Sequence, residues 1–307
     1  MAVIIFLLVL AAAALALSGY SYYIAFYSPR KERRKDTDLP DTDQYRVFRE
    51  ENLQRIQRLR TEPHEEVSIR SFDGLTLTGK FYHRQEDAPV ALCFHGWRGS
   101  GIRDFCGGAF SLMELGFNVL LVDQRAQGGS DGRTITFGIK ERFDCVEWVR
   151  FIAACFGSET DVCLYGVSMG AATVLMAAGL GLPENVRCVV ADCPYSSPKA
   201  IIQKVCADMK IPPAVAYPFV ALGARLFGGF SLSSVSTEEE VRKATVPILV
   251  IHGTDDRFVP CSMSESFTAN PHVQRETFPG AGHGLSFLVD RPRYEKLIRD
   301  FTTWTGR

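Results

Sequence analysis

The chain has 307 residues, of which 46% are hydrophobic and 22% are charged. This balance is typical of a globular protein with a sizeable core, and it excludes an intrinsically disordered chain. The formal net charge of −1 provides no global field for nucleic acid, so we expect no nucleic-acid partner. The length allows one large domain or two small ones.

The N-terminal segment, residues 1–27, carries no charged side chain and is followed by a basic cluster at residues 30–35. A spanning helix needs roughly 20 apolar residues, which this segment supplies. No lysine or arginine precedes the apolar run, whereas a cleaved signal peptide normally begins with basic residues. We therefore predict a transmembrane anchor. The basic cluster predicts that the rest of the chain lies in the cytoplasm. The alternative is secretion after signal cleavage.

Residues 28–66 form a polar juxtamembrane connector, in which apolar residues from Val47 to Leu59 are spaced for an amphipathic helix. We expect a solvated spacer helix rather than a helix on the bilayer surface, because Glu50 and Glu51 dilute its basic face. The nine cysteines are scattered, odd in number and without a CxxC spacing. They favour a reducing compartment and buried thiols over disulfides or a zinc site.

From residue 67 to 307 the pattern alternates between short apolar runs and helix-length segments. Two strands flank Asp73-Gly74 and predict an antiparallel hairpin. Later apolar runs predict strands buried on both faces of a parallel sheet. Helix-length segments lie between them, at 102–116, 137–156 and 169–181. The chain is therefore expected to form an α/β domain, a mostly parallel sheet with helices on both faces.

One interval is longer than a simple crossover. About fifty residues separate the apolar runs near 187–192 and 246–252. A structureless loop of this length is uncommon in a compact domain. We expect residues 194–240 to form a small apolar helical lid that helps to line the substrate pocket. The alternative is one crossover helix with a long loop.

The sequence Gly166-Val167-Ser168-Met169-Gly170 lies between a predicted strand and a predicted helix. In a G-x-S-x-G turn of this kind the serine oxygen stands above the strand ends, and the helix N-terminus directs N–H groups toward developing negative charge. Ser168 is therefore the candidate nucleophile, and a tight packing turn is the alternative.

A serine hydroxyl needs a base, which is usually a histidine. His283 is the candidate because it lies in a glycine-rich loop after the last predicted strand. His95 and His252 precede glycine at strand ends, and we expect them to shape loops. Asp255 and Asp256 follow another strand, and their spacing does not decide which one orients the imidazole.

These motifs resemble the α/β-hydrolase superfamily, and most of all a membrane-anchored bacterial branch related to eukaryotic ABHD-type serine hydrolases. The order serine, aspartate, histidine is the order of that family. The resemblance implies that Asp256 is the triad acid, through the H-G-x-x-D-x-x-V-P motif at 252–260. It also implies that the backbone N–H groups of Trp97 and Met169 form the oxyanion hole. The D-x-R-x-x-G-x-S segment at 123–130 resembles a structural motif of the family.

The expected function is hydrolysis of acyl esters through an acyl-enzyme on Ser168, without a metal or organic cofactor. A serine peptidase or an acyltransferase would use the same triad, and a ligand-binding module would keep the fold without turnover. The lipase-type HGGG motif is absent, which weakens the reading as a lipase for bulky esters. The expected partners are a small acyl-ester or lipid-like substrate and a membrane.

Overall fold

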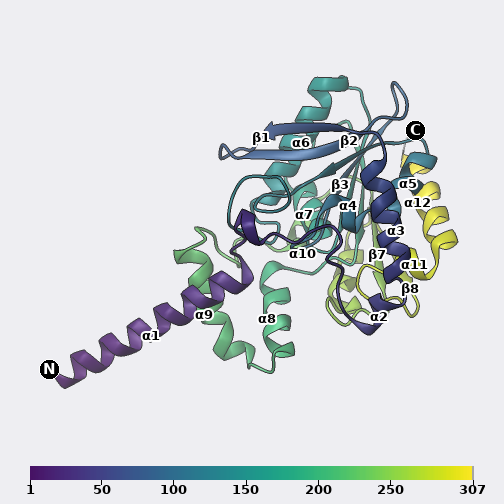
Figure 1. Ribbon diagram of the computed structural model, residues 1–307. Coiled ribbons are helices and arrows are strands. Elements are labelled where there is room, and N and C mark those ends of the chain that lie inside the picture. The colour runs from purple at the N-terminus through teal and green to yellow at the C-terminus, as the bar shows by residue number, and fades with distance from the viewer. Residues whose placement is uncertain (306–307) are drawn as a thin grey trace.

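The computed structural model describes residues 1–305 and contains an eight-stranded sheet in the order β1-β2-β4-β3-β5-β6-β7-β8 (Figure 1). The hairpin strands β1 and β2 pair antiparallel, β2 pairs antiparallel with β4, and the remaining neighbours run parallel. Both the predicted hairpin and the predicted parallel sheet are confirmed. The strand bounds are β1 Glu65–Arg70, β2 Thr76–Tyr82, β3 Val90–Phe94, β4 Asn118–Val122, β5 Val162–Val167, β6 Val186–Asp192, β7 Ile248–Gly253 and β8 Val273–Phe278.

Helices cover both faces of this sheet, as the alternation of the sequence predicts. On one face α3, α5 and α12 pack on the strands, and on the other α6, α7 and α10 do so. The helix bounds are α1 Ala2–Ala25, α2 Asp43–Arg46, α3 Arg49–Thr61, α4 Gly101–Asp104, α5 Gly108–Glu114, α6 Glu141–Phe156, α7 Met169–Ala178, α8 Pro198–Asp208, α9 Pro213–Leu226, α10 Thr237–Lys243, α11 Ser286–Val289 and α12 Arg291–Thr305, with short 3₁₀ segments at Arg30–Glu32 and Cys261–Ala269.

The central strands show why their sequences are continuous apolar runs. In β3 the side chains of Ala91 and Cys93 enter one core cluster, whereas Val90, Leu92 and Phe94 enter the cluster on the opposite face. Successive side chains of a strand point to opposite faces, so a strand covered on both sides has no polar face. The parallel core also brings the carboxyl ends of β3, β5, β6 and β7 to one edge, where the candidate site lies.

The long interval between β6 and β7 is helical, and it consists of α8, α9 and α10. The interval thus contains inserted helices, as expected, and their role as a lid stays a prediction. The helix α9 packs along α1, and its residue Val220 joins a cluster that contains Phe26 from the N-terminal segment. The apolar residues of this interval pack both on the N-terminal segment, at Phe26, and on the domain, at Phe137 and Met169.

The connector is more closely packed than a solvated spacer. In α3 the residues Asn52, Ile56 and Leu59 are buried, at the i, i+4 and i+7 spacing of one helix face. Ile56 and Leu59 belong to the same core cluster as the α5 and α12 residues. The expectation of a solvated spacer is thus wrong for residues 49–61, because their apolar stripe finds a partner on the sheet domain.

The N-terminal helix α1 projects from the domain, and its outer part contacts no other element in Figure 1. Among residues 1–305 it is the one helix long and apolar enough to cross a membrane. Its inner end belongs to the domain. Ser18 is buried, and Phe26, just beyond the helix, is fully buried against Phe137 and Phe230.

Candidate active site

Ser168 stands at the sharp turn between β5 and α7. Its backbone has φ 56° and ψ −115°, a conformation that non-glycine residues rarely adopt and that often marks a functional site. Two glycines make the turn possible. A Cβ at Gly166 would lie 2.3 Å from the backbone oxygen of Gly170, and a Cβ at Gly170 would lie 1.9 Å from that of Phe94. The turn therefore accepts no larger residue at either position.

The structure brings Ser168, His283 and Asp256 together. His283 Nε2 lies 2.8 Å from Ser168 Oγ, and His283 Nδ1 lies 2.7 Å from Asp256 Oδ2. These groups come from the ends of β5, β7 and β8, separated by 115 positions in the case of the serine and the histidine. Asp255, in contrast, is exposed and its carboxylate accepts from Thr254 Oγ1. The geometry thus separates the two aspartates that the sequence left open. Assignment of the three groups as a catalytic triad stays a prediction.

The Asp256 carboxylate is held in its ionised form. Burial alone would raise its pKa, but hydrogen bonds from His252 and His283 and the backbone N–H of Val259 outweigh burial and lower the pKa below its ordinary value. Oδ1 accepts the N–H groups of Phe258 and Val259 at 2.9 and 2.8 Å. A fixed anion at this position favours the Nδ1–H tautomer of His283, which leaves Nε2 free to accept a proton.

The two proposed oxyanion donors flank the serine. Met169 is the first residue of α7, so its N–H has no partner within the helix and points from the positive end of the helix dipole. Trp97 follows Gly96, and a Cβ built at Gly96 would lie 3.4 Å from Ser168 Cβ. The Trp97 loop is therefore next to the serine. The indole Nε1 donates to the backbone oxygen of Ala25 at 3.2 Å, which ties this loop to the end of α1.

The other histidines at strand ends have local partners. His95 is buried, its Nδ1 lies 2.8 Å from the Gly96 oxygen, and its Nε2 accepts the N–H of Gln124. His252 lies between Ser264 Oγ and the Val259 oxygen, each 2.9 Å away. Both histidines thus shape the loops that carry Trp97 and Asp256.

The segment at 123–130 also has a structural environment. Its Arg125 is buried and forms ion pairs with Asp144 and Asp73 at 2.6 and 2.9 Å. Asp123 accepts the N–H of Gly129, and Gly128 has φ +49°. None of these residues lines the cavity beside Ser168.

A cavity of about 700 Å³ opens beside Ser168 and His283. Its apolar lining includes Phe105, Phe287 and Leu288, and residues 39–45 of the connector form another wall. No residue of 194–240 lines it. This segment therefore does not line the cavity, and the expectation that it forms a lid stays a prediction. Its buried apolar residues pack on Phe26, Phe137 and Met169, while the connector folds back over the site.

The connector supplies contacts that its amphipathic pattern did not predict. Tyr45 Oη donates to the backbone oxygen of His283 at 2.6 Å, and Gln44 Nε2 donates to that of Asp255 at 3.2 Å. The ring of Phe258 packs against the His283 imidazole at 5.1 Å between centroids. The His283 loop is thus held from both sides.

Asp192 was not singled out from the sequence. The signal that could have found it is its place at the end of an apolar strand, β6, which pairs with β5. Its backbone oxygen accepts the Ser168 N–H at 2.8 Å, and its Oδ2 accepts from Tyr294 at 3.1 Å. Burial raises the pKa of Asp192 to about 6, against the lowering effect of the Tyr294 hydrogen bond. Asp192 is one of the residues that line the cavity.

One trio of potential metal ligands occurs among residues 1–305. Atoms of Cys193, Asp256 and His283 lie within 4.8 Å of one another. Burial raises the pKa of the Cys193 thiol well above its ordinary value, so this thiol stays protonated. The metal ligand is the thiolate, and the aspartate and histidine already bond to each other. This donor set is a poor fit for a metal ion.

The comparisons with known proteins agree with this architecture. The family model described as alpha/beta hydrolase fold matches residues 89–246. The chain is 27% identical over 192 residues to protein YqkD of Bacillus subtilis (strain 168), covering 62% of this chain and 63% of YqkD. It is 27% identical over 210 residues to human protein ABHD12B, covering 62% of this chain and 53% of that protein. The chain thus spans between half and two thirds of these relatives.

Among solved structures, the Pyrococcus furiosus esterase Pf2001 superimposes with a TM-score of 0.65 at 23% identity, covering 80% of this chain and 93% of the esterase. This likeness supports the fold. With more than half of its length matched by the family model, and with strand order and turn geometry in agreement, the chain belongs to the α/β-hydrolase fold family.

Proposed function

We propose that the protein is a serine hydrolase that cleaves carboxylic ester bonds through a Ser168–His283–Asp256 triad. One observation carries the proposal: His283 lies within hydrogen-bond distance of both Ser168 Oγ and Asp256 Oδ2, at 2.8 and 2.7 Å, at the rim of a cavity. A nucleophile, a base and a group that orients the base are the parts that acyl transfer requires.

In the acylation step Ser168 Oγ attacks the ester carbonyl carbon while its proton moves to His283 Nε2. The tetrahedral intermediate places its negative charge on the former carbonyl oxygen, toward the N–H groups of Trp97 and Met169. Loss of one such donor typically costs about 2.7–4 kcal/mol of barrier. Collapse of the intermediate breaks the bond to the alcohol, which takes the proton from Nε2. Water then repeats the sequence on the acyl-enzyme and releases the acid.

The decisive test is a pair of assays on the wild type and Ser168→Ala. A fluorophosphonate probe should label the wild type and not the variant, and hydrolysis of p-nitrophenyl esters should disappear in the variant. Thermal unfolding of both proteins checks that the variant is folded. Labelling of the variant at the wild-type rate, or residual hydrolysis within a few-fold, would remove Ser168 as the nucleophile.

The cavity favours an ester with an apolar acyl chain. Phe105, Phe287 and Leu288 form an apolar wall, and each buried methylene contributes about 0.8 kcal/mol to binding. We expect kcat/KM to rise with acyl length until the chamber is filled. Phe287→Ala should shift the optimum toward longer chains. Phe227→Ala is the control, because Phe227 packs on α1 and is not part of the lining.

We also propose that residues 1–27 anchor the protein in a membrane, with the domain on the cytoplasmic side. The support is the exposed apolar helix α1 and the basic cluster that follows it. N-terminal sequencing should find Met1 or Ala2, and a protease added to intact cells should leave the domain uncut. A mature start near residue 19 would remove the anchor, and digestion in intact cells would reverse the orientation.

A further inference from the structure

The helix α9 has two apolar faces, and only one of them is covered. Val220, Gly223 and Ala224 are buried where α9 meets α1 and the domain. The approach is close, because a Cβ at Gly223 would lie 2.3 Å from the backbone oxygen of Ser18. The opposite face is exposed, and it carries Val215, Pro218, Leu222 and Leu226 at helical spacing. A helix that is apolar on all sides is typical of a core or a membrane.

The turn before α9 carries two further exposed apolar residues. Met209 and Ile211 are 57% and 41% exposed, and Val215 and Leu226 are 59% and 55% exposed. We call Met209, Ile211, Val215, Leu222 and Leu226 the hairpin surface. Exposed apolar residues scattered singly need no explanation, but a contiguous group indicates an interaction site.

The segment that contains the hairpin surface carries charges of predominantly one sign. Residues 198–226 contain four basic residues and one acidic residue, which are Lys199, Lys204, Lys210, Arg225 and Asp208. Asp208 is paired with Lys204 within α8. Lys210 and Arg225 belong to the same segment as the hairpin surface, and an apolar face with basic residues in its segment complements a surface that is apolar inside and anionic at its boundary.

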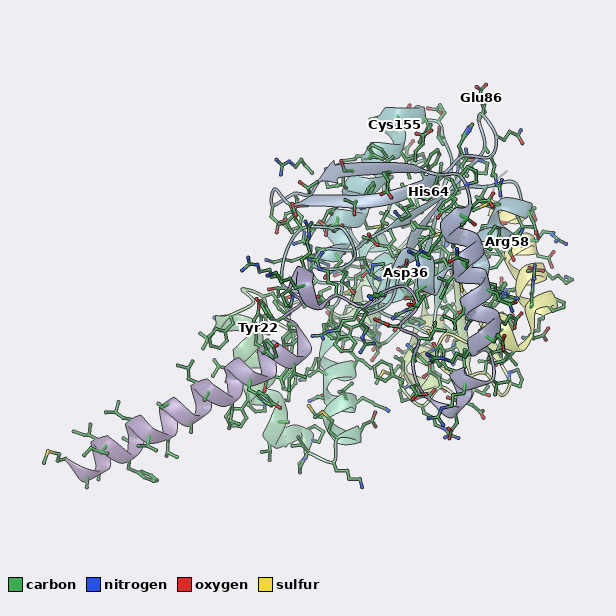
Figure 2. The ribbon with its side chains drawn as sticks, viewed as in Figure 1. Tyr22, Asp36, Arg58, His64, Glu86 and Cys155 are labelled. Atoms are coloured by element: carbon green, nitrogen blue, oxygen red, sulfur yellow. The ribbon has the colours of Figure 1, made fainter. Side chains whose placement is uncertain are left out.

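The location of the hairpin surface identifies that partner. In Figure 1, α9 lies beside the inner end of α1 and α8 lies beside α9, on the side of the molecule from which α1 projects. In Figure 2, Tyr22 marks this inner end, and the side chains farther out along α1 stand clear of the domain. A bilayer crossed by α1 would therefore meet α8 and α9 where the helix enters the domain.

We propose that the hairpin surface is a membrane-docking surface, which lies at the boundary between headgroups and acyl chains of an anionic bilayer, next to α1. The inference rests on the proposed insertion of α1. It differs from a lid, because no residue of the hairpin surface lines the cavity beside Ser168. Two contacts with the bilayer, a spanning helix and an interfacial helix, would fix the tilt of the domain, which one helix alone would not.

The experiment uses the full-length protein in vesicles of equal parts phosphatidylcholine and phosphatidylglycerol that contain a diazirine-bearing lipid. After irradiation and trypsin digestion, lipid adducts are counted on three peptides. Residues 1–30 report α1, and residues 211–225 report the hairpin surface. Residues 71–80, which carry exposed Phe72 and do not line the cavity, are the control. The hairpin peptide should carry adducts well above the control peptide. Vesicles of phosphatidylcholine alone should reduce its yield, roughly fivefold for each basic residue that reaches the surface.

Variants make the test sharper. Val215→Glu combined with Leu222→Glu should reduce adducts on the hairpin peptide to the control level and leave those on residues 1–30 unchanged. Val289→Glu, at a valine that is 41% exposed and lies outside the hairpin surface, should change neither. The variants lie outside the cavity, so hydrolysis of a short soluble ester should remain, and thermal unfolding checks their folding in either case.

Adducts on residues 1–30 with none above control on residues 211–225 would overturn the docking surface and leave the anchor intact. Absence of adducts on both peptides would overturn both. Adducts on 211–225 that persist in the double variant would also overturn the assignment, because burial in lipid would then not depend on the apolar face. None of these results depends on ester hydrolysis. A failure of the proposed hydrolase activity can therefore be distinguished from a failure of the docking surface.

Discussion

Tyr45 lies outside every catalytic motif, yet its hydroxyl donates to the backbone oxygen of His283 at 2.6 Å. Burial raises the pKa of Tyr45 well above its ordinary value, so the hydroxyl remains a donor throughout the working pH range. Tyr45→Phe removes this hydrogen bond and keeps the ring that lines the cavity. We expect Tyr45 to be a positioning residue, which acts on catalysis through the His283 loop.

The expected magnitude follows from one lost neutral hydrogen bond, about 0.5–1.5 kcal/mol. If the whole of this free energy is lost from the stabilisation of the transition state, kcat should fall by about 2- to 13-fold. KM should change little, because the shape of the cavity is kept. The assay is steady-state hydrolysis of a p-nitrophenyl ester at several pH values.

The control is Tyr217→Phe, which removes an exposed hydroxyl that lies 3.1 Å from Ser233 Oγ, away from the cavity. This variant should keep the wild-type kcat. The reasoning is refuted if Tyr45→Phe leaves kcat unchanged, or if its whole effect appears in KM. An equal loss in Tyr217→Phe would show a general effect of losing a hydroxyl rather than a specific role of Tyr45.

Further predictions concern the acid, the oxyanion loop and pH. Asp256→Asn should lower kcat on the order of 10⁴-fold, and Asp255→Asn should stay within a few-fold; a larger loss for Asp255 would reverse the assignment. Trp97→Phe removes the bond to the Ala25 oxygen and keeps the backbone N–H, so kcat should fall several-fold while fluorophosphonate labelling still occurs, only more slowly. Asp192 has a pKa of about 6 in the folded protein, above its unfolded value, so it lowers stability as pH rises from about 4 to 6. Asp192→Asn should therefore increase the free energy of unfolding at pH 8 by up to about 3 kcal/mol and by much less at pH 4, measured by urea unfolding.

The sheet and the positions around Ser168 were predictable because their signals are local. A buried parallel strand has no polar face, and the turn at Gly166 and Gly170 admits no side chain. The choice between Asp255 and Asp256 was not predictable from spacing. It depends on how the loop after β7 turns, with Oδ1 of Asp256 accepting two N–H groups of the same loop.

The tertiary partners of two segments could not be predicted, because amphipathic patterns show that a face is buried but not by what. The stripe of Ile56 and Leu59 was visible, yet its partners in α5 and α12 lie far along the chain. The many apolar residues of 194–240 were likewise visible in the sequence, and we interpreted some of them as the lining of a substrate pocket. The structure places Phe227 against Tyr22 instead. Contacts between such distant segments leave no trace in a local pattern.

The burial of Phe26 between Phe137 and Phe230 has a consequence for how the protein is made. During translation the helix α1 leaves the ribosome first, whereas Phe230 follows about 200 residues later. At about 5–20 residues per second, roughly 10–40 s separate the two rings. During that interval Phe26, at the inner end of α1, lacks its native contact with Phe230. The inner end of α1 therefore packs against the domain only after the domain is complete, and not when α1 itself emerges.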